Sequence, residues 1–157
     1  MRIIEICLSL MLLAVVTPPP FRGWKGIVPL HSTRADVERE LGAPVTSCVE
    51  TCNYNTPNES VTIVYVTHAC ESGDNNSWRV PAGTVVTVIV YPSVKPRLKD
   101  LKVNSKSFTK TRDPELVGHW TYTSKREGTS YEVSNTGRVQ SIEWFPTNKD
   151  DYLRCDQ

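Results

Sequence analysis

The first periodic pattern along the chain is a short stretch of helical spacing in its first third. Ser32 or Thr33 can cap the start, and Asp36 stands three residues after Thr33, as in a capping box. Val37 and Leu41 lie one helical turn apart and define a single apolar face. A glycine and then a proline follow, which are typical signals for a helix end. The pattern predicts one short helix that depends on tertiary packing for its stability.

After residue 59 the pattern changes to runs of β-branched and aromatic residues. These runs predict strands at 60–67, 84–91, 120–124, 129–133 and 138–145. The second run is apolar on both faces and is therefore expected at the centre of a sheet, in a long antiparallel pair with the first. Glycine-containing turns separate the last three runs, as hairpins require. The predicted fold class is α+β: a small antiparallel β-sheet domain with one short N-terminal helix, fastened by disulfides.

Residues 95–112, called here the basic segment, differ in composition from the strands around them. A single acid, Asp100, accompanies seven cations: Lys95, Arg97, Lys99, Lys102, Lys106, Lys110 and Arg112. Scattered apolar residues predict that the segment crosses the surface and is pinned by them. The seven cations are the candidate site for binding an anionic surface. The alternative is a solvated loop whose lysines prevent edge pairing.

The amino terminus has the pattern of an export signal. Arg2 precedes a continuous apolar run at 6–16, which is shorter than the roughly 20 residues of a membrane span but suits a secretory signal. We therefore expect a signal peptide at 1–16, an extended proline-rich lead-in at 17–28, and a single domain at 29–157. The alternative is an N-terminal core helix. After signal removal, no transmembrane span is predicted.

Cysteine usage supports export to an oxidising compartment. Removing the signal takes away Cys7 and leaves an even set: Cys48, Cys52, Cys70 and Cys155. Four cysteines allow three pairings, and the sequence does not choose among them. Because a Cys48–Cys52 bond closes a very small loop, we favour one of these two joining Cys70 and the other joining Cys155. A four-thiolate zinc site is the alternative, although two tightly spaced pairs are missing.

Residues 29–44, which run from Pro29 through the capped helix to Leu41-Gly42-Ala43-Pro44, resemble the opening of the SmpA/OmlA (BamE-like) family of small exported bacterial proteins. The whole chain is also similar to uncharacterised exported bacterial proteins that pair this opening with an end like Leu153-Arg154-Cys155. The resemblance implies a capped helix followed by an antiparallel sheet, and it implies no catalytic residues.

Candidate chemistry is sparse. The histidines His31, His68 and His119 are not paired at a metal-binding spacing, and no nucleophile elbow or phosphate-binding glycine loop occurs in the sequence. The formal net charge of +1 gives no reason to expect nucleic acid. The sequence predicts a non-catalytic exported module, periplasmic or extracellular, without cofactor or metal, that binds a protein or an anionic envelope component. The alternatives are a small secreted enzyme inhibitor and an enzyme of unrecognised type.

Overall fold

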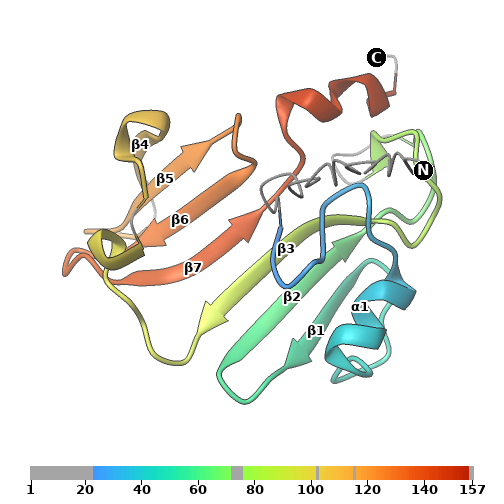
Figure 1. Ribbon diagram of the computed structural model, residues 1–157, viewed down its shortest axis with the longest axis horizontal. Coiled ribbons are helices and arrows are strands. Elements are labelled where there is room, and N and C mark those ends of the chain that lie inside the picture. Colours follow the sequence, from blue (N-terminus) through green and yellow to red (C-terminus); the bar gives the residue numbers. More distant parts are fainter. Residues whose placement is uncertain (1–22, 72–75, 102, 115, 156–157) are drawn as a thin grey trace, which may run out of the picture.

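The computed structural model describes residues 23–71, 76–101, 103–114 and 116–155. The predicted signal peptide and residues 17–22 of the lead-in lie outside these ranges. One antiparallel sheet dominates the fold, and its strands are β1 (Thr51–Asn55), β2 (Glu59–Tyr65), β3 (Val85–Pro92), β4 (Thr109–Arg112), β5 (Trp120–Ser124), β6 (Thr129–Val133) and β7 (Val139–Trp144). The seven strands lie in the order β1-β2-β3-β7-β6-β5-β4 (Figure 1). The antiparallel sheet, the short helix and the disulfides of the prediction are confirmed, in a molecule that is mostly sheet.

The sheet consists of two meanders joined at one seam. β1 to β3 form one meander and β4 to β7 the other, and β3 pairs with β7 through Val88 opposite Trp144 and Val90 opposite Ile142. The prediction of a central strand at 84–91 is confirmed, because β3 has a hydrogen-bonded neighbour on each side. The valines of β3 suit this position, because Val85, Val88 and Val90 are buried in one core cluster and Val86 is buried in a second.

The one α-helix of the described residues, α1 (Arg34–Leu41), begins and ends as predicted. Thr33 caps it in a complete capping box with Asp36, and Gly42 follows at φ 81°. The backbone and hydroxyl of Thr33 and the guanidinium of Arg39 hold the pKa of Asp36 at about 2. Val37 is fully buried and anchors the helix on the core over β1 and β2.

Two strands and the turns around them were not predicted. β1 has only two inward side chains, Cys52 and Tyr54, among polar residues, and β4 is exposed along its whole length. The predicted lead-in, where it is described, forms a tight turn closed between Trp24 and Ile27, and both side chains are buried in the core. Short 3-10 turns, η2 (Leu98–Leu101), η3 (Ser105–Ser107) and η4 (Asn148–Leu153), complete the fold. Within the described ranges, no helix is long and apolar enough to cross a bilayer.

All four predicted cysteines form disulfides, but the favoured pairing is wrong. Cys48 joins Cys52, and Cys70 joins Cys155. The small loop closes easily because the chain turns after α1 and enters β1, which brings the two Cα atoms to 5.4 Å. Cys155 reaches Cys70 because residues 153–155 pair with 77–79, through hydrogen bonds such as Cys155 N to the Ser77 carbonyl.

Candidate functional site

The basic segment crosses one face of the C-terminal meander and is held at both ends. At its start, the Leu98 N–H donates to the carbonyl of Gly137 in the β6–β7 turn. At the far end, the Phe108 ring packs against Tyr131 of β6 with a centroid distance of 5.5 Å, and the chain then enters β4. The predicted pinning by apolar residues is confirmed at Phe108, whereas the start of the segment is held by backbone hydrogen bonding. The segment is therefore attached to the sheet at both ends, and its described cations lie over this part of the sheet.

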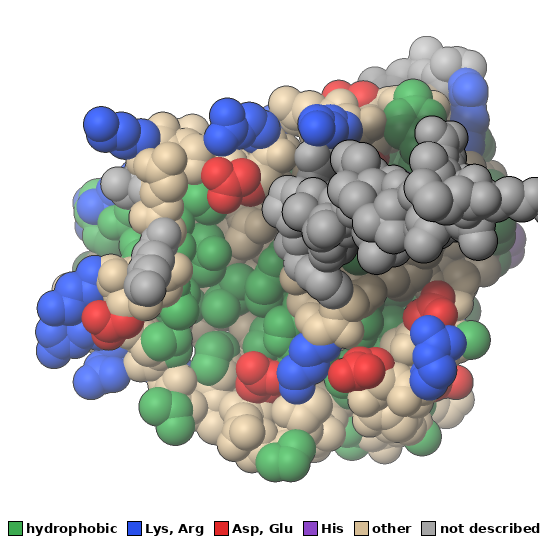
Figure 2. Space-filling model, in the orientation of Figure 1, with side chains coloured by type: hydrophobic (Ala, Val, Ile, Leu, Met, Phe, Trp, Pro, Cys, Tyr) green, Lys and Arg blue, Asp and Glu red, His purple; other side chains and the backbone are tan. Residues whose placement is uncertain are grey.

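A shallow groove lies beside the start of the segment and has a volume of about 340 Å³. We call it the basic groove, and it is lined by Arg97, Leu98, Lys99, Tyr122, Val133, Thr136 and Gly137. Figure 2 shows hydrophobic side chains gathered over the C-terminal meander, with lysines and arginines along its margin. The groove thus combines an aromatic and apolar floor from β5 and β6 with a cationic wall.

The structure separates the six described cations of the predicted site. Arg97 and Lys99 line the groove, whereas the Lys110 ammonium lies on the edge strand, 4.0 Å from the centroid of the Trp120 ring and 5.5 Å from that of Tyr122. Lys95, Lys106 and Arg112 are exposed but do not line the groove, and Lys102 lies outside the described residues.

The cations of the basic segment, where described, lack ion-pair partners among the described residues. None of the six described side chains lies within salt-bridge distance of a carboxylate among the residues that the structure describes. Lys95 bonds instead to the side chain of Gln140, and Arg138 holds the segment by donating to the Lys95 carbonyl. An unpaired cation beside an aromatic surface favours a ligand with negative charge and some apolar area.

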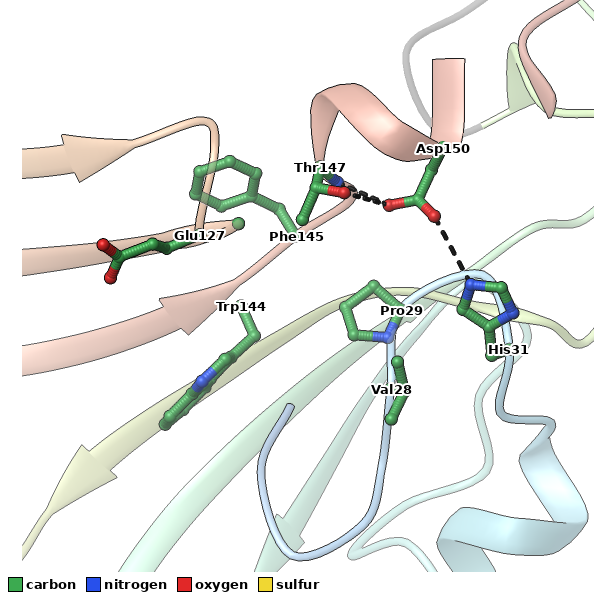
Figure 3. A pocket seen from close by; sticks show the side chains of 9 residues that line it. Val28, Pro29, His31, Glu127, Trp144, Phe145, Thr147 and Asp150 are labelled. Carbon is green, nitrogen blue, oxygen red and sulfur yellow. Dashed lines mark hydrogen bonds and ion pairs between the residues drawn. The ribbon is translucent and has the colours of Figure 1, made fainter. Parts of the chain in front are cut away.

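A second hollow lies between residues 28–31, the β5–β6 turn and residues 144–150 (Figure 3). It holds about 40 Å³, enough for a few water molecules and too little for a substrate. His31 Nε2 is 3.4 Å from Asp150 Oδ1, and Asp150 also accepts from the backbone and hydroxyl of Thr147. Burial raises the pKa of Asp150, but these hydrogen bonds and the nearby imidazole outweigh it, so the pKa is lowered. The arrangement caps η4 and ties it to the chain ahead of α1.

The remaining histidines are also engaged with single carboxylates. His68 lies 3.2 Å from Glu71, and His119 lies 2.9 Å from Glu132 on the polar face of the sheet. Over the part of the chain that the structure describes, no three histidine, cysteine or acidic side chains gather as metal ligands would. The sulfurs that a zinc site would need are joined in disulfides.

Comparison with known proteins finds no match to a family model, to a curated protein or to a solved structure. The resemblance of residues 29–44 to the SmpA/OmlA family therefore stays a prediction.

The sequence predicted the cations that line the groove but not the residues that form its floor. Tyr122 and Val133 come from separate strands, and only the pairing of β5 with β6 brings them beneath the basic segment.

Proposed function

We propose that the protein is a non-catalytic exported module that binds an anionic polymer of the cell envelope in the basic groove. The polymer carries carboxylates or phosphates, which Arg97 and Lys99 pair with while its backbone lies on Tyr122. The observation that carries the proposal is the pair of unneutralised cations on the wall of an aromatic groove.

The groove suits a short length of an extended chain. Its volume of about 340 Å³ is at the small end of ordinary ligand sites, which span roughly 300–1,000 Å³. Arg97 is held in place because its backbone bridges to Arg138 across the β6–β7 turn. Thr136 adds a hydroxyl at the same wall, where the Gly137 carbonyl already accepts from Leu98 and its N–H donates to Ser134. A pre-positioned cationic wall reduces the entropy lost on binding.

The disulfides support the exported location. Two disulfides in a chain of this size are typical of proteins that mature outside the reducing cytosol. Envelope polymers of the kind proposed are met in that compartment. The disulfides thus favour the compartment in which a cationic groove would meet an anionic polymer.

The test compares two double variants with the same change in net charge. Arg97→Gln/Lys99→Gln removes the wall of the groove, and Lys125→Gln/Lys149→Gln removes two exposed cations elsewhere. With about 1 kcal/mol per cation at an anionic surface, the groove variant should bind immobilised polygalacturonate roughly thirtyfold more weakly. We expect the control variant to bind like the wild type, and retention to fall as salt rises from about 0.05 to 0.5 M.

Further arms of the experiment identify the kind of polyanion. Polyphosphate tests for phosphate groups, and vesicles of phosphatidylglycerol test for a flat anionic surface. Neutral dextran should not be retained. Equal losses for the two double variants, on every anionic probe, would refute binding in the groove.

A second candidate, a small secreted enzyme inhibitor, is favoured by a different feature. The Cys48–Cys52 disulfide fastens a loop whose Val49 side chain is 75% exposed, and Val45 just before it is 57% exposed. A fastened loop with outward apolar residues is a suitable element to present to an enzyme. Val49→Asp would abolish inhibition of a target hydrolase and leave retention on polyanions unchanged, so the two functions are separable.

A further inference from the structure

The guanidinium of Arg34 lies against the Cys48–Cys52 disulfide. Its Nη1 is 3.1 Å from Cys52 Sγ and 3.6 Å from Cys48 Sγ, while Nη2 donates to the carbonyl of Val49 inside the loop. Arg34 is the first residue of α1, and its guanidinium is held by the Val49 carbonyl and the ring of Tyr65. A rigidly placed cation therefore touches both sulfurs.

No carboxylate among the described residues lies within salt-bridge distance of Arg34. Its other contact is the face of the Tyr65 ring, with the guanidinium carbon 4.2 Å from the centroid. Burial and the hydrogen bond with Tyr54 raise the pKa of Tyr65 far above its ordinary value, so the phenol is neutral and supplies no countercharge. The cation is thus available to a negative charge that develops on sulfur.

The two sulfurs have different surroundings. Cys52 is fully buried in the core, whereas Cys48 is partly exposed beside the exposed Val49. An attacking thiolate can approach Cys48, and the sulfur that leaves is then the one closer to Arg34. Burial alone disfavours a Cys52 thiolate, but a charge-assisted hydrogen bond from a guanidinium opposes that cost.

We propose that Cys48–Cys52 is a thiol–disulfide exchange site that accepts two electrons from a dithiol, with Arg34 stabilising the leaving thiolate. One thiolate of the dithiol attacks Cys48 Sγ, so a mixed disulfide forms and Cys52 leaves as a thiolate beside Arg34. The second thiolate of the dithiol then attacks the dithiol's first sulfur, which is bonded to Cys48, and releases Cys48. The dithiol ends as a disulfide, its two protons pass to Cys48 and to solvent, and Cys52 keeps its negative charge.

The other disulfide is an internal control. Cys70 is exposed and bonded to Cys155, and no cationic side chain in the described ranges hydrogen-bonds to either sulfur. Nearby Arg154 lies over the Trp78 ring and pairs with Asp151. The bond joins residues 85 apart, so its reduction is coupled to the stability of the whole fold.

The experiment titrates the intact oxidised protein with dithiothreitol redox buffers and counts each disulfide by differential alkylation and mass spectrometry. We expect Cys48–Cys52 to be reduced first, while the fold persists. Arg34→Gln should lower the equilibrium constant for reduction roughly tenfold, equivalent to about 30 mV for two electrons. Arg34→Lys should restore most of it. Arg39→Gln, which removes an exposed arginine of the same helix, should change nothing.

A direct measurement of the thiolate covers the case in which Arg34→Gln fails to fold. In Cys48→Ser, the ultraviolet absorbance of the Cys52 thiolate should appear below the usual cysteine pKa of about 8.5. Absorbance only above that pH would overturn the proposal. Reduction of Cys48–Cys52 only together with Cys70–Cys155, as expected of a purely structural bond, would overturn it as well.

Discussion

Removing the Cys70–Cys155 disulfide is expected to cost more stability than removing Cys48–Cys52. The two bonds span 85 and 4 residues, respectively. In the chain-entropy description, loops of these lengths correspond to about 4.6 and about 2 kcal/mol at 25 °C. Truncating the buried sulfur of Cys52 adds about 1 kcal/mol to the second value. The expected losses are therefore about 4.6 kcal/mol for Cys70→Ser/Cys155→Ser and about 3 kcal/mol for Cys48→Ala/Cys52→Ala.

Urea denaturation without reductant measures both losses, and thermal unfolding gives a second readout. At about 3 °C per kcal/mol for a domain of this size, the midpoint should fall by about 14 °C for the first variant and about 9 °C for the second. The reasoning is refuted if the long-range bond costs less than the local one. That result would mean that the pairing of residues 153–155 with 77–79 already restrains the unfolded chain.

Three further predictions concern single positions. Gly128→Ala should destabilise the fold by more than about 2 kcal/mol, because at φ 62° the new Cβ would lie 2.4 Å from a backbone oxygen. Gly137→Ala, at φ 76°, meets open space and should cost about 1 kcal/mol, so equal losses in chemical denaturation would contradict the reasoning. Tyr54→Phe should cost about 1–3 kcal/mol because it leaves the buried hydroxyl of Tyr65 without its partner at 2.9 Å, and the double phenylalanine variant should recover much of that loss. The pKa of Asp150 is lower in the folded chain than in the unfolded one. The Asp150 carboxylate therefore contributes stability above the unfolded pKa of about 3.9, and this contribution is lost as pH falls through the folded pKa. Asp150→Asn should flatten the fall in stability below pH about 4, and an unchanged slope would rule out this role.

The sequence was informative where a local signal sufficed. The helix start is determined by a capping box within four residues, and β5 and β6 were predicted with their observed bounds because glycine-containing turns separate short β-branched runs. β1 escaped prediction because only Cys52 and Tyr54 face the core there. β4 escaped because an edge strand with every side chain exposed shows no apolar alternation.

The sites depend on contacts between residues far apart in sequence. The Cys70–Cys155 pairing follows from the antiparallel bridge between Arg154 and Trp78, and no local sequence pattern predicts this bridge. Similarly, the groove needs Tyr122 beneath Arg97, and the exchange site needs Arg34 beside a sulfur 18 positions away. The sequence identified the cations and the cysteines, but it did not predict the residues that each of them contacts.

The seam between the two meanders has a consequence for the order in which the molecule can be completed. β3 is bounded by β2 on one side and, on the other, by β7, the last strand of the described residues in chain order. Until residues 139–144 emerge, β3 presents an unpaired, valine-rich edge, the kind of edge that captures other chains. Chains interrupted before residue 139 should therefore accumulate as aggregates, and completion of the sheet must await residues 139–144.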